Sequence, residues 1–303
     1  MRSKKNTIDV EEDSLAEIER YAKWALVEAG AEGHLPTRVD DIVASAKLAV
    51  AEDISLDQPH SSFFSKAFGI LSSALAKLRA LVDLRDNIIY LDLSMSPQRV
   101  NFATLHECGH KTLPWQRAAY RYEDDDYTLG SEVEAQFECE ANKFAAEVLF
   151  QLDRFTKEAA DLPLTIRTPL GLSKKYGASC HAAIRRYVEG HHHECAVLVC
   201  RASGVVGDGG PRLEVEHVVY SGSFHARYGK LRLPTTLSSE HAFSRLVFEE
   251  RVRLFDTGSI ELEDGNSDRF RANFHIFNST YRVFVLIFPC RLSRRGWNRI
   301  VRF

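Results

Sequence analysis

Apolar residues at helical spacing predict helices near the start of the chain. Residues 14–29 combine this spacing with Ser14 as an N-cap, and residues 39–50 follow the same pattern. Residues 61–82 are apolar enough for a helix, a strand or a mixture, and the pattern leaves this open. A turn signal opens residues 84–93, and the apolar run that follows it favours a buried strand.

Two further helices are predicted on either side of a polar segment. Ser96-Pro97 is an N-cap followed by proline at the first helical position, and this helix can run until Leu113-Pro114. Residues 115–130 are polar, acidic and aromatic, which indicates an excursion over the surface. Residues 131–149 return to helical spacing, with Ser131 and Glu134 as a capping box.

The second half of the chain changes in pattern. Residues 172–190 have the spacing of a helix-turn-helix, with a turn at Gly177. Beyond residue 193 the pattern predicts strands, at 195–202, 212–220 and 281–288. We therefore expect an α+β protein whose second domain is α/β or rich in β-structure.

Composition and charge refine this division. Residues 1–162 hold 18 basic against 29 acidic residues, whereas residues 163–303 hold 21 against 13. An acidic N-terminal half and a basic C-terminal half suggest two units with different partners. We expect a first domain at 1–162, a helix-turn-helix-like linker at 163–193 and a second domain at 194–303.

Two features indicate a cytoplasmic protein with no membrane partner. No stretch approaches the roughly 18 consecutive apolar residues that cross a bilayer, and the first residues lack the apolar block of a secretory signal. The six cysteines fall at irregular intervals, which favours reduced thiols over a disulfide framework.

The motif with the clearest chemistry is His106-Glu107-Cys108-Gly109-His110. Two histidines at i and i+4 lie on one helical face, so both imidazoles can reach one zinc ion. Glu107 projects beside them, where it can accept the proton of an activated water. The motif therefore predicts a hydrolytic centre.

Catalytic zinc usually has three protein ligands, so a third donor is required. In the predicted helix 131–149, Glu134 and Glu138 lie on the same face as Ala141. Burying an unpaired carboxylate costs free energy, and a nearby cation offsets that cost. Glu138 is central on this face and Glu134, one turn earlier, is the alternative.

Other residues are assigned smaller parts. Asn142 is placed to hydrogen bond a ligand from outside the coordination shell, whereas Glu140 and Glu147 are expected on a solvated face. Cys290 is a candidate inhibitory ligand that would hold the enzyme silent at the fourth zinc position, although a buried inert thiol is the favoured interpretation. The run His191-His192-His193 is a weaker candidate metal site.

These segments together resemble a known family. HECGH, followed by ECEANKFAAEVL and preceded by LRDNIIYLDL and SPQRVNFATL, is similar to the ImmA/IrrE family of zinc metallopeptidases over roughly residues 14–150. The resemblance assigns the zinc ligands to His106, His110 and Glu138 and the acid/base to Glu107. This chain departs from the family at 149–151, where it has Leu-Phe-Gln and the family often has a leucine-methionine-proline sequence that ends the helix.

The resemblance implies a zincin-like peptidase domain and, from the length of the remaining chain, a GAF-like sensor domain. It also implies limited proteolysis of a helix-turn-helix repressor, which would switch on a DNA-damage or antiphage-defence response. Tyr120, Tyr122 and Tyr127 are candidate hydrogen-bond donors to the oxyanion, and the acidic cluster at 124–126 would suit a basic target.

Nucleic acid is a second class of partner. Arginines surround Trp297 and Phe303 in the C-terminal segment 291–303, a composition that suits single-stranded DNA as an activator. In the helix-turn-helix-like segment, Arg185 and Arg186 could contact DNA, although packing between the domains is favoured. The alternative function is a non-hydrolytic DNA-binding regulator with a structural zinc site.

Overall fold

The computed structural model describes residues 12–51, 80–92, 94–122, 130–203, 210–279 and 281–290. The chain divides into two compact units. Unit 1 comprises residues 1–155 and 174–179, and unit 2 comprises residues 156–173 and 180–303. The predicted α+β class is confirmed, because the chain contains helices together with two separate sheets.

Unit 1 is mostly helical and has a small sheet. Its elements are α1 (Glu12–Glu28), α2 (Val39–Ser45), β1 (Ala49–Ala51), β2 (Ala80–Asp83), β3 (Ile88–Leu91), α5 (Pro97–Thr112), α6 (Pro114–Tyr122) and α7 (Ser131–Leu149). In the sheet, β3 lies between the other two strands, parallel to β1 and antiparallel to β2.

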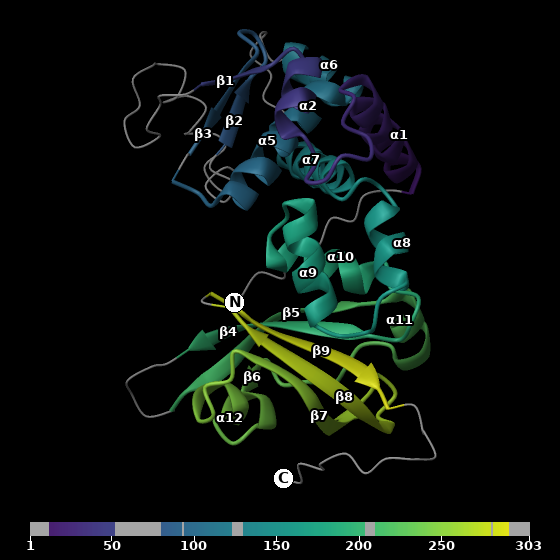
Figure 1. Ribbon diagram of the computed structural model, residues 1–303, viewed down its shortest axis with the longest axis vertical. Coiled ribbons are helices and arrows are strands. Elements are labelled where there is room, and N and C mark those ends of the chain that lie inside the picture. Colours follow the sequence, from purple (N-terminus) through teal and green to yellow (C-terminus); the bar gives the residue numbers. More distant parts are fainter. Residues whose placement is uncertain are drawn as a thin grey trace. The chain divides into compact units, whose positions relative to one another are not determined.

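The core of unit 1 forms around α7, which packs against both α1 and α5 (Figure 1). Ile18 and Leu26 of α1 are buried, as are Phe144 and Val148 of α7. The helical spacing that predicted α1 and α7 is therefore the spacing of their buried faces. Helix α5 also contacts β2 and β3, which places one helix between the sheet and α7.

Three helices follow α7 in the sequence and precede the sheet of unit 2. They are α8 (Arg154–Ala160), α9 (Arg167–Tyr176) and α10 (Cys180–Glu189), the last two separated by Gly177 with φ +66°. The predicted helix-turn-helix spacing is present. Tyr176 is fully buried in unit 1 beside Phe150 and Phe155, whereas Ile184 is buried in unit 2.

Unit 2 is built on a six-stranded antiparallel sheet with the order β6-β5-β4-β9-β8-β7. Its elements beyond residue 190 are β4 (Ala196–Ser203), β5 (Arg212–Tyr220), α11 (Gly222–Tyr228), β6 (Thr236–Leu237), α12 (Ala242–Phe248), β7 (Leu254–Glu263), β8 (Arg269–Asn278) and β9 (Val283–Pro289). The three strands predicted beyond residue 193 correspond to β4, β5 and β9, and the strand predicted within 84–93 is β3 of unit 1.

Helices lie against this sheet (Figure 1). Phe224 of α11 and Phe243 of α12 are fully buried in a core with alternate residues of the central strands, such as Leu198 and Val285. Helix α10 packs on β4 and β5, where the rings of His181 and His217 stack. Within the described residues, no helix has the length and apolarity needed to span a membrane.

One predicted helix is shorter than expected. Residues 39–50 were predicted to be one helix, but α2 ends at Ser45 and residues 49–51 form β1. Lys47 has φ +57°, and the Leu48 N–H bonds to the Val43 carbonyl, which closes the helix. Of the ambiguous segment 61–82, only its last residues are described, in β2.

The surface excursion predicted over 115–130 is wrong for its first part, which is α6. Gln116 of α6 is fully buried. The helix was not predicted because its buried side includes a polar residue, so the sequence shows no apolar periodicity there. The N-cap predicted at Ser14 and the capping box predicted at Ser131 are also wrong, because α1 begins at Glu12 and the N-cap of α7 is Gly130. Residues 123–129 lie outside the described residues.

Candidate metal centre

Helices α5 and α7 approach closely because small residues face each other where they cross. A Cβ added to Gly109 would lie 3.2 Å from Phe144 Cδ1 and 3.3 Å from the Ala141 Cα. Such contacts are tighter than packed side chains normally make. The glycine inside the helical motif therefore allows the contact that brings the histidines of α5 to α7.

His106, His110 and Glu138 come together at this crossing. The two Nε2 atoms lie 3.0 Å apart, and each is 3.4 Å from an oxygen of Glu138. Both histidines are buried and Glu138 is largely so. Among the described residues, no other set of three His, Cys, Asp or Glu side chains brings its potential metal ligands this close. The arrangement could bind a metal ion.

The outer nitrogen of each imidazole has a polar partner. His106 Nδ1 lies 3.2 Å from Asn142 Oδ1, and His110 Nδ1 lies 2.8 Å from Gln116 Oε1. Each imidazole therefore directs Nε2 toward Glu138. Gln116 was missed in the sequence because it follows the motif in a segment with no apolar periodicity.

The charges of the cluster support one another. Burial raises the pKa of Glu138, but its hydrogen bonds to the two imidazoles outweigh this and hold that pKa well below its usual range. Burial lowers the pKa of His110, yet the carboxylates of Glu138 and Glu107 reverse the shift, so the net change is upward. The site thus combines a stabilised carboxylate with two imidazoles.

Glu107 lies in a different environment. Its side chain is 2% exposed, and its Oε1 has no hydrogen-bond partner among the residues that the structure describes. Burial raises the pKa of Glu107, and the two histidines and a hydrogen bond from the Val82 backbone offset this only in part. A buried oxygen with no partner beside a ligand cluster is suited to accept a proton from a bound molecule.

Comparison with known families agrees with this geometry. Residues 70–187 match the family model described as the IrrE N-terminal-like domain, peptidase M78. This segment is therefore similar to an IrrE N-terminal-like domain of the metallopeptidase type. It contains α5 and α7 with the whole ligand cluster.

The chain also has a distant neighbour among the solved structures. A Mycobacterium tuberculosis transcriptional regulator of known structure aligns with 90% of this chain and 74% of its own, at 11% sequence identity and a TM-score of 0.47. No curated protein sequence matches the chain.

Two glutamates of α7 are buried, contrary to their predicted exposure. Glu140 and Glu147 were expected on a solvated face, but both are 1% exposed. Glu147 pairs with Lys143 at 2.6 Å, and Glu140 Oε2 accepts a hydrogen bond from Trp115 Nε1 at 2.6 Å. Lys143 lies one turn before Glu147 on α7, and Trp115 lies on α6. Both partners offset the free-energy cost of burying the two carboxylates. Glu134 is partly buried and is not part of the cluster.

Neither Cys108, inside the motif, nor Cys290 belongs to a cluster of three converging ligands among the described residues. Burial raises the pKa of the Cys108 thiol far above its usual value, which favours the protonated form. Cys290 follows β9 in unit 2, and its thiol donates to Asn273 Oδ1 at 3.1 Å. An inhibitory role for Cys290 stays a prediction.

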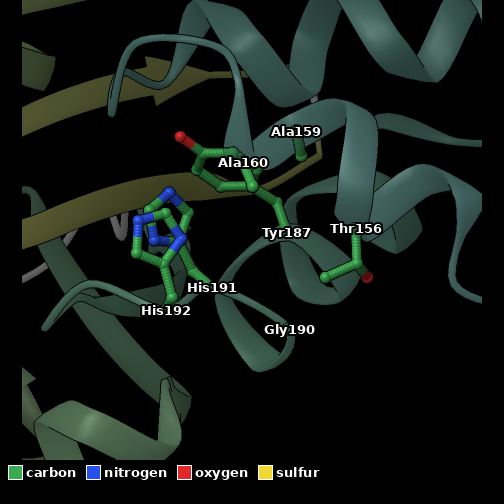
Figure 2. A pocket seen from close by; sticks show the side chains of 7 residues that line it. All are labelled: Thr156, Ala159, Ala160, Tyr187, Gly190, His191 and His192. Atoms are coloured by element: carbon green, nitrogen blue, oxygen red, sulfur yellow. The ribbon is translucent and has the colours of Figure 1, made fainter.

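The three consecutive histidines do not form a second group of converging ligands within the described residues. His191 and His192 stack with ring centroids 5.0 Å apart, beside Tyr187 in a small cavity (Figure 2). His191 Nδ1 accepts a hydrogen bond from the backbone N–H of His193. The run is a packed turn between α10 and β4.

Several predicted residues cannot be placed in the site. Tyr127, the acidic cluster at 124–126 and the arginine-rich segment 291–303 lie outside the described residues. Tyr120 and Tyr122 belong to α6, but the description does not extend to their side chains. The oxyanion donor is therefore not assigned.

Proposed function

We propose that this protein is a zinc-dependent endopeptidase that cleaves a protein partner. The observation that carries the proposal is the convergence of His106, His110 and Glu138 beside the buried Glu107. The IrrE-like match over residues 70–187 supports the same chemistry. The proposed class is that of the HExxH enzymes with a glutamate as third ligand.

The donor set fits zinc. Two imidazole nitrogens and one carboxylate oxygen are the ligands of many catalytic zinc sites, which keep a further position for water or substrate. Glu107 Oε1, buried without a partner, gives such a water an acceptor. When bound, zinc supplies Lewis acidity that makes a water more acidic and polarises a carbonyl.

The chain's own residues perform the proton transfers in this proposal. Glu107 accepts a proton from the attacking water and then donates it to the nitrogen of the leaving amine, so one carboxyl group serves both steps. Asn142 and Gln116 hold the two imidazoles through their Nδ1 atoms. Glu138 supplies the negative charge that balances the cation.

We propose a helix-turn-helix transcriptional repressor as the substrate, with cleavage switching on a DNA-damage or antiphage-defence response. The support is the resemblance of the motif segments to the ImmA/IrrE family. Unit 2 is proposed as a GAF-like sensor domain, since its antiparallel sheet has α11 and α12 packed on one face and α10 packed on β4 and β5.

A DNA-binding regulator with a structural zinc site is the alternative. That function requires a closed set of four ligands, whereas three side chains converge among the described residues. Helix α10 packs on the sheet of unit 2, and its exposed Arg185 pairs with Glu189. Neither observation favours binding in a DNA groove.

Single-stranded DNA as an activator has no support in the described residues. Arg201, Arg227 and Arg282 of unit 2 each form an ion pair with a glutamate. Binding of single-stranded DNA can be measured separately, by fluorescence anisotropy with labelled oligonucleotides over a salt series.

The decisive experiment compares the unaltered chain with Glu107→Gln. We expect both proteins to bind one zinc ion, but only the unaltered chain to cleave a helix-turn-helix protein encoded beside it. Because Gln cannot accept and return the proton, cleavage should fall by at least about 100-fold. Casein serves as a general substrate, which separates a specific from a broad peptidase. Retained cleavage by Glu107→Gln would contradict the proposed base.

A further inference from the structure

A chain of buried hydrogen bonds leads away from the ligand cluster. His110 Nδ1 contacts Gln116 Oε1 at 2.8 Å, and Gln116 Nε2 in turn donates to Glu140 Oε2 at 2.8 Å. Gln116 is fully buried, Glu140 is 1% exposed and His110 is 5% exposed. The three side chains therefore interact with little competition from water.

The orientation of the Gln116 amide is determined by its surroundings. Its Nε2 donates both to Glu140 Oε2 and, at 3.1 Å, to the carbonyl oxygen of Phe137. Rotating the amide by 180° would place its oxygen against two other oxygens, which only accept hydrogen bonds. The amide oxygen must therefore face His110.

Glu140 is in turn fixed by three donors. Trp115 Nε1 donates at 2.6 Å and Gln116 Nε2 at 2.8 Å to one carboxylate oxygen, and Gln136 Nε2 donates at 3.0 Å to the other. Three donors and no acceptor suit a carboxylate that only accepts. The Glu140 carboxylate is therefore held in one orientation, and it fixes the orientation of the Gln116 amide.

We propose that Gln116 is a positioning residue, oriented by Glu140, that fixes the tautomer of His110. An amide oxygen can only accept a hydrogen bond, so His110 must carry its proton on Nδ1 and present an unprotonated Nε2 to the metal. The inference rests on the proposed function, because it assigns these residues to the zinc site. It adds two residues of α6 and α7 that the motif does not contain.

Zinc affinity of the full-length chain tests the proposal. Zinc is titrated in competition with a chromophoric chelator, first into the unaltered protein and then into Gln116→Leu. Because leucine removes the acceptor for Nδ1–H, affinity should fall about 10- to 100-fold. The control is Gln151→Leu, which removes another buried glutamine of unit 1 that bonds Gly33 N, Ala31 O and Thr37 Oγ1. We expect the control to lower the melting temperature without changing zinc affinity.

An exchange of the two groups provides a rescue. In the double variant Gln116→Glu/Glu140→Gln, a carboxylate accepts from His110 Nδ1–H and an amide stands in the position of Glu140. The bonds from His110 to position 116 and from position 116 to position 140 are retained, while Trp115 Nε1 and the Phe137 carbonyl lose their partners. Zinc affinity should therefore recover in part, to at least about tenfold above that of Gln116→Leu. A purely structural role of Gln116 would predict no such recovery.

A spectroscopic measurement reports the tautomer directly. The ¹⁵N shifts of the His110 imidazole in the zinc-free chain, at an alkaline pH where this ring is neutral, should indicate a proton on Nδ1 alone. Glu140→Gln should give a mixture of tautomers, because an amide at position 140 can also donate to a rotated Gln116, whose own NH2 group then faces His110. This variant also keeps the proposal testable should Gln116→Leu fail to fold. An unchanged tautomer and an unchanged zinc affinity in Glu140→Gln would overturn the inference.

The outcomes separate the two proposals. An unaltered chain that binds no zinc overturns the proposed function, and this inference with it. An unaltered chain that binds zinc and cleaves its partner, together with Gln116→Leu of equal zinc affinity, overturns only the positioning role.

Discussion

Glu138 is the third member of the proposed metal site. Its oxygens lie 3.4 Å from the Nε2 atoms of His106 and His110, which are 3.0 Å apart in a buried space. Burying like-charged or unpaired groups is expensive. The carboxylate therefore supports both the packing of α5 on α7 and the binding of a cation.

Substitution of the two candidate glutamates separates their roles. Glu138→Gln removes the charge from the cluster, and we expect zinc affinity to fall at least about 100-fold, because an amide is a poor zinc ligand. Glu134→Gln, one turn earlier on α7, is the matched control and should keep the affinity of the unaltered chain. Isothermal titration with zinc measures both. Equal affinity of Glu138→Gln and the unaltered chain would remove Glu138 from the ligand set.

Single residues also show where sequence reasoning ends. The faces of α7 that hold Ala141 and Phe144 could be predicted, because apolar periodicity reports burial directly. The burial of Glu140 could not, since it depends on Trp115 and Gln116 from another helix. A polar residue becomes a core residue only through partners that are distant in the sequence.

At the scale of elements, the crossing of α5 and α7 depends on one glycine. Gly109→Val would place its side chain against Phe144 and Ala141, where even a Cβ has only 3.2–3.3 Å. We expect a loss of about 1–3 kcal/mol in the free energy of unfolding, as overpacking typically costs. Chemical denaturation followed by circular dichroism measures it.

The control for that variant is Gly171→Val on α9. Gly171 is exposed, and a Cβ there meets nothing within 4 Å, so the same substitution should change stability by no more than about 0.5 kcal/mol. Similar losses at both positions would show that helix propensity, rather than the close approach at Gly109, accounts for the effect.

Whole elements were predictable where one face is apolar. The bounds of α7 and β5 match the predicted ranges, because both segments carry apolar residues at the spacing of their element, such as Phe137, Ala141 and Phe144 in α7. Helix α6 was missed because its buried contacts are polar, and β7 was not identified because Asp256 and Gly258 interrupt its pattern. Gly258 is required there, since a Cβ would lie 2.2 Å from the Phe274 ring. Such contacts between strands are not visible in a local pattern.

At the scale of the molecule, the chain leaves unit 1 and then returns to it. Residues 156–173 belong to unit 2, whereas residues 174–179 belong to unit 1. Tyr176 in the returning segment is fully buried, with its ring centroid 5.2 Å from that of Phe155 and 6.3 Å from that of Phe150. Unit 1 therefore includes a segment beyond residue 162, and we expect this segment to contribute to its stability.

Truncation tests this return. A fragment of residues 1–162 lacks Tyr176 and should expose Phe150 and Phe155 to water, so we expect it to bind a hydrophobic dye and to be less stable than a fragment of residues 1–179. In the full chain, Tyr176→Ala should cost about 3–5 kcal/mol, as loss of a buried aromatic ring does elsewhere. Thermal unfolding and dye fluorescence measure these effects. If the shorter fragment were as stable as the longer one, the ring contacts of Tyr176 would contribute little, and unit 1 would be complete at residue 162.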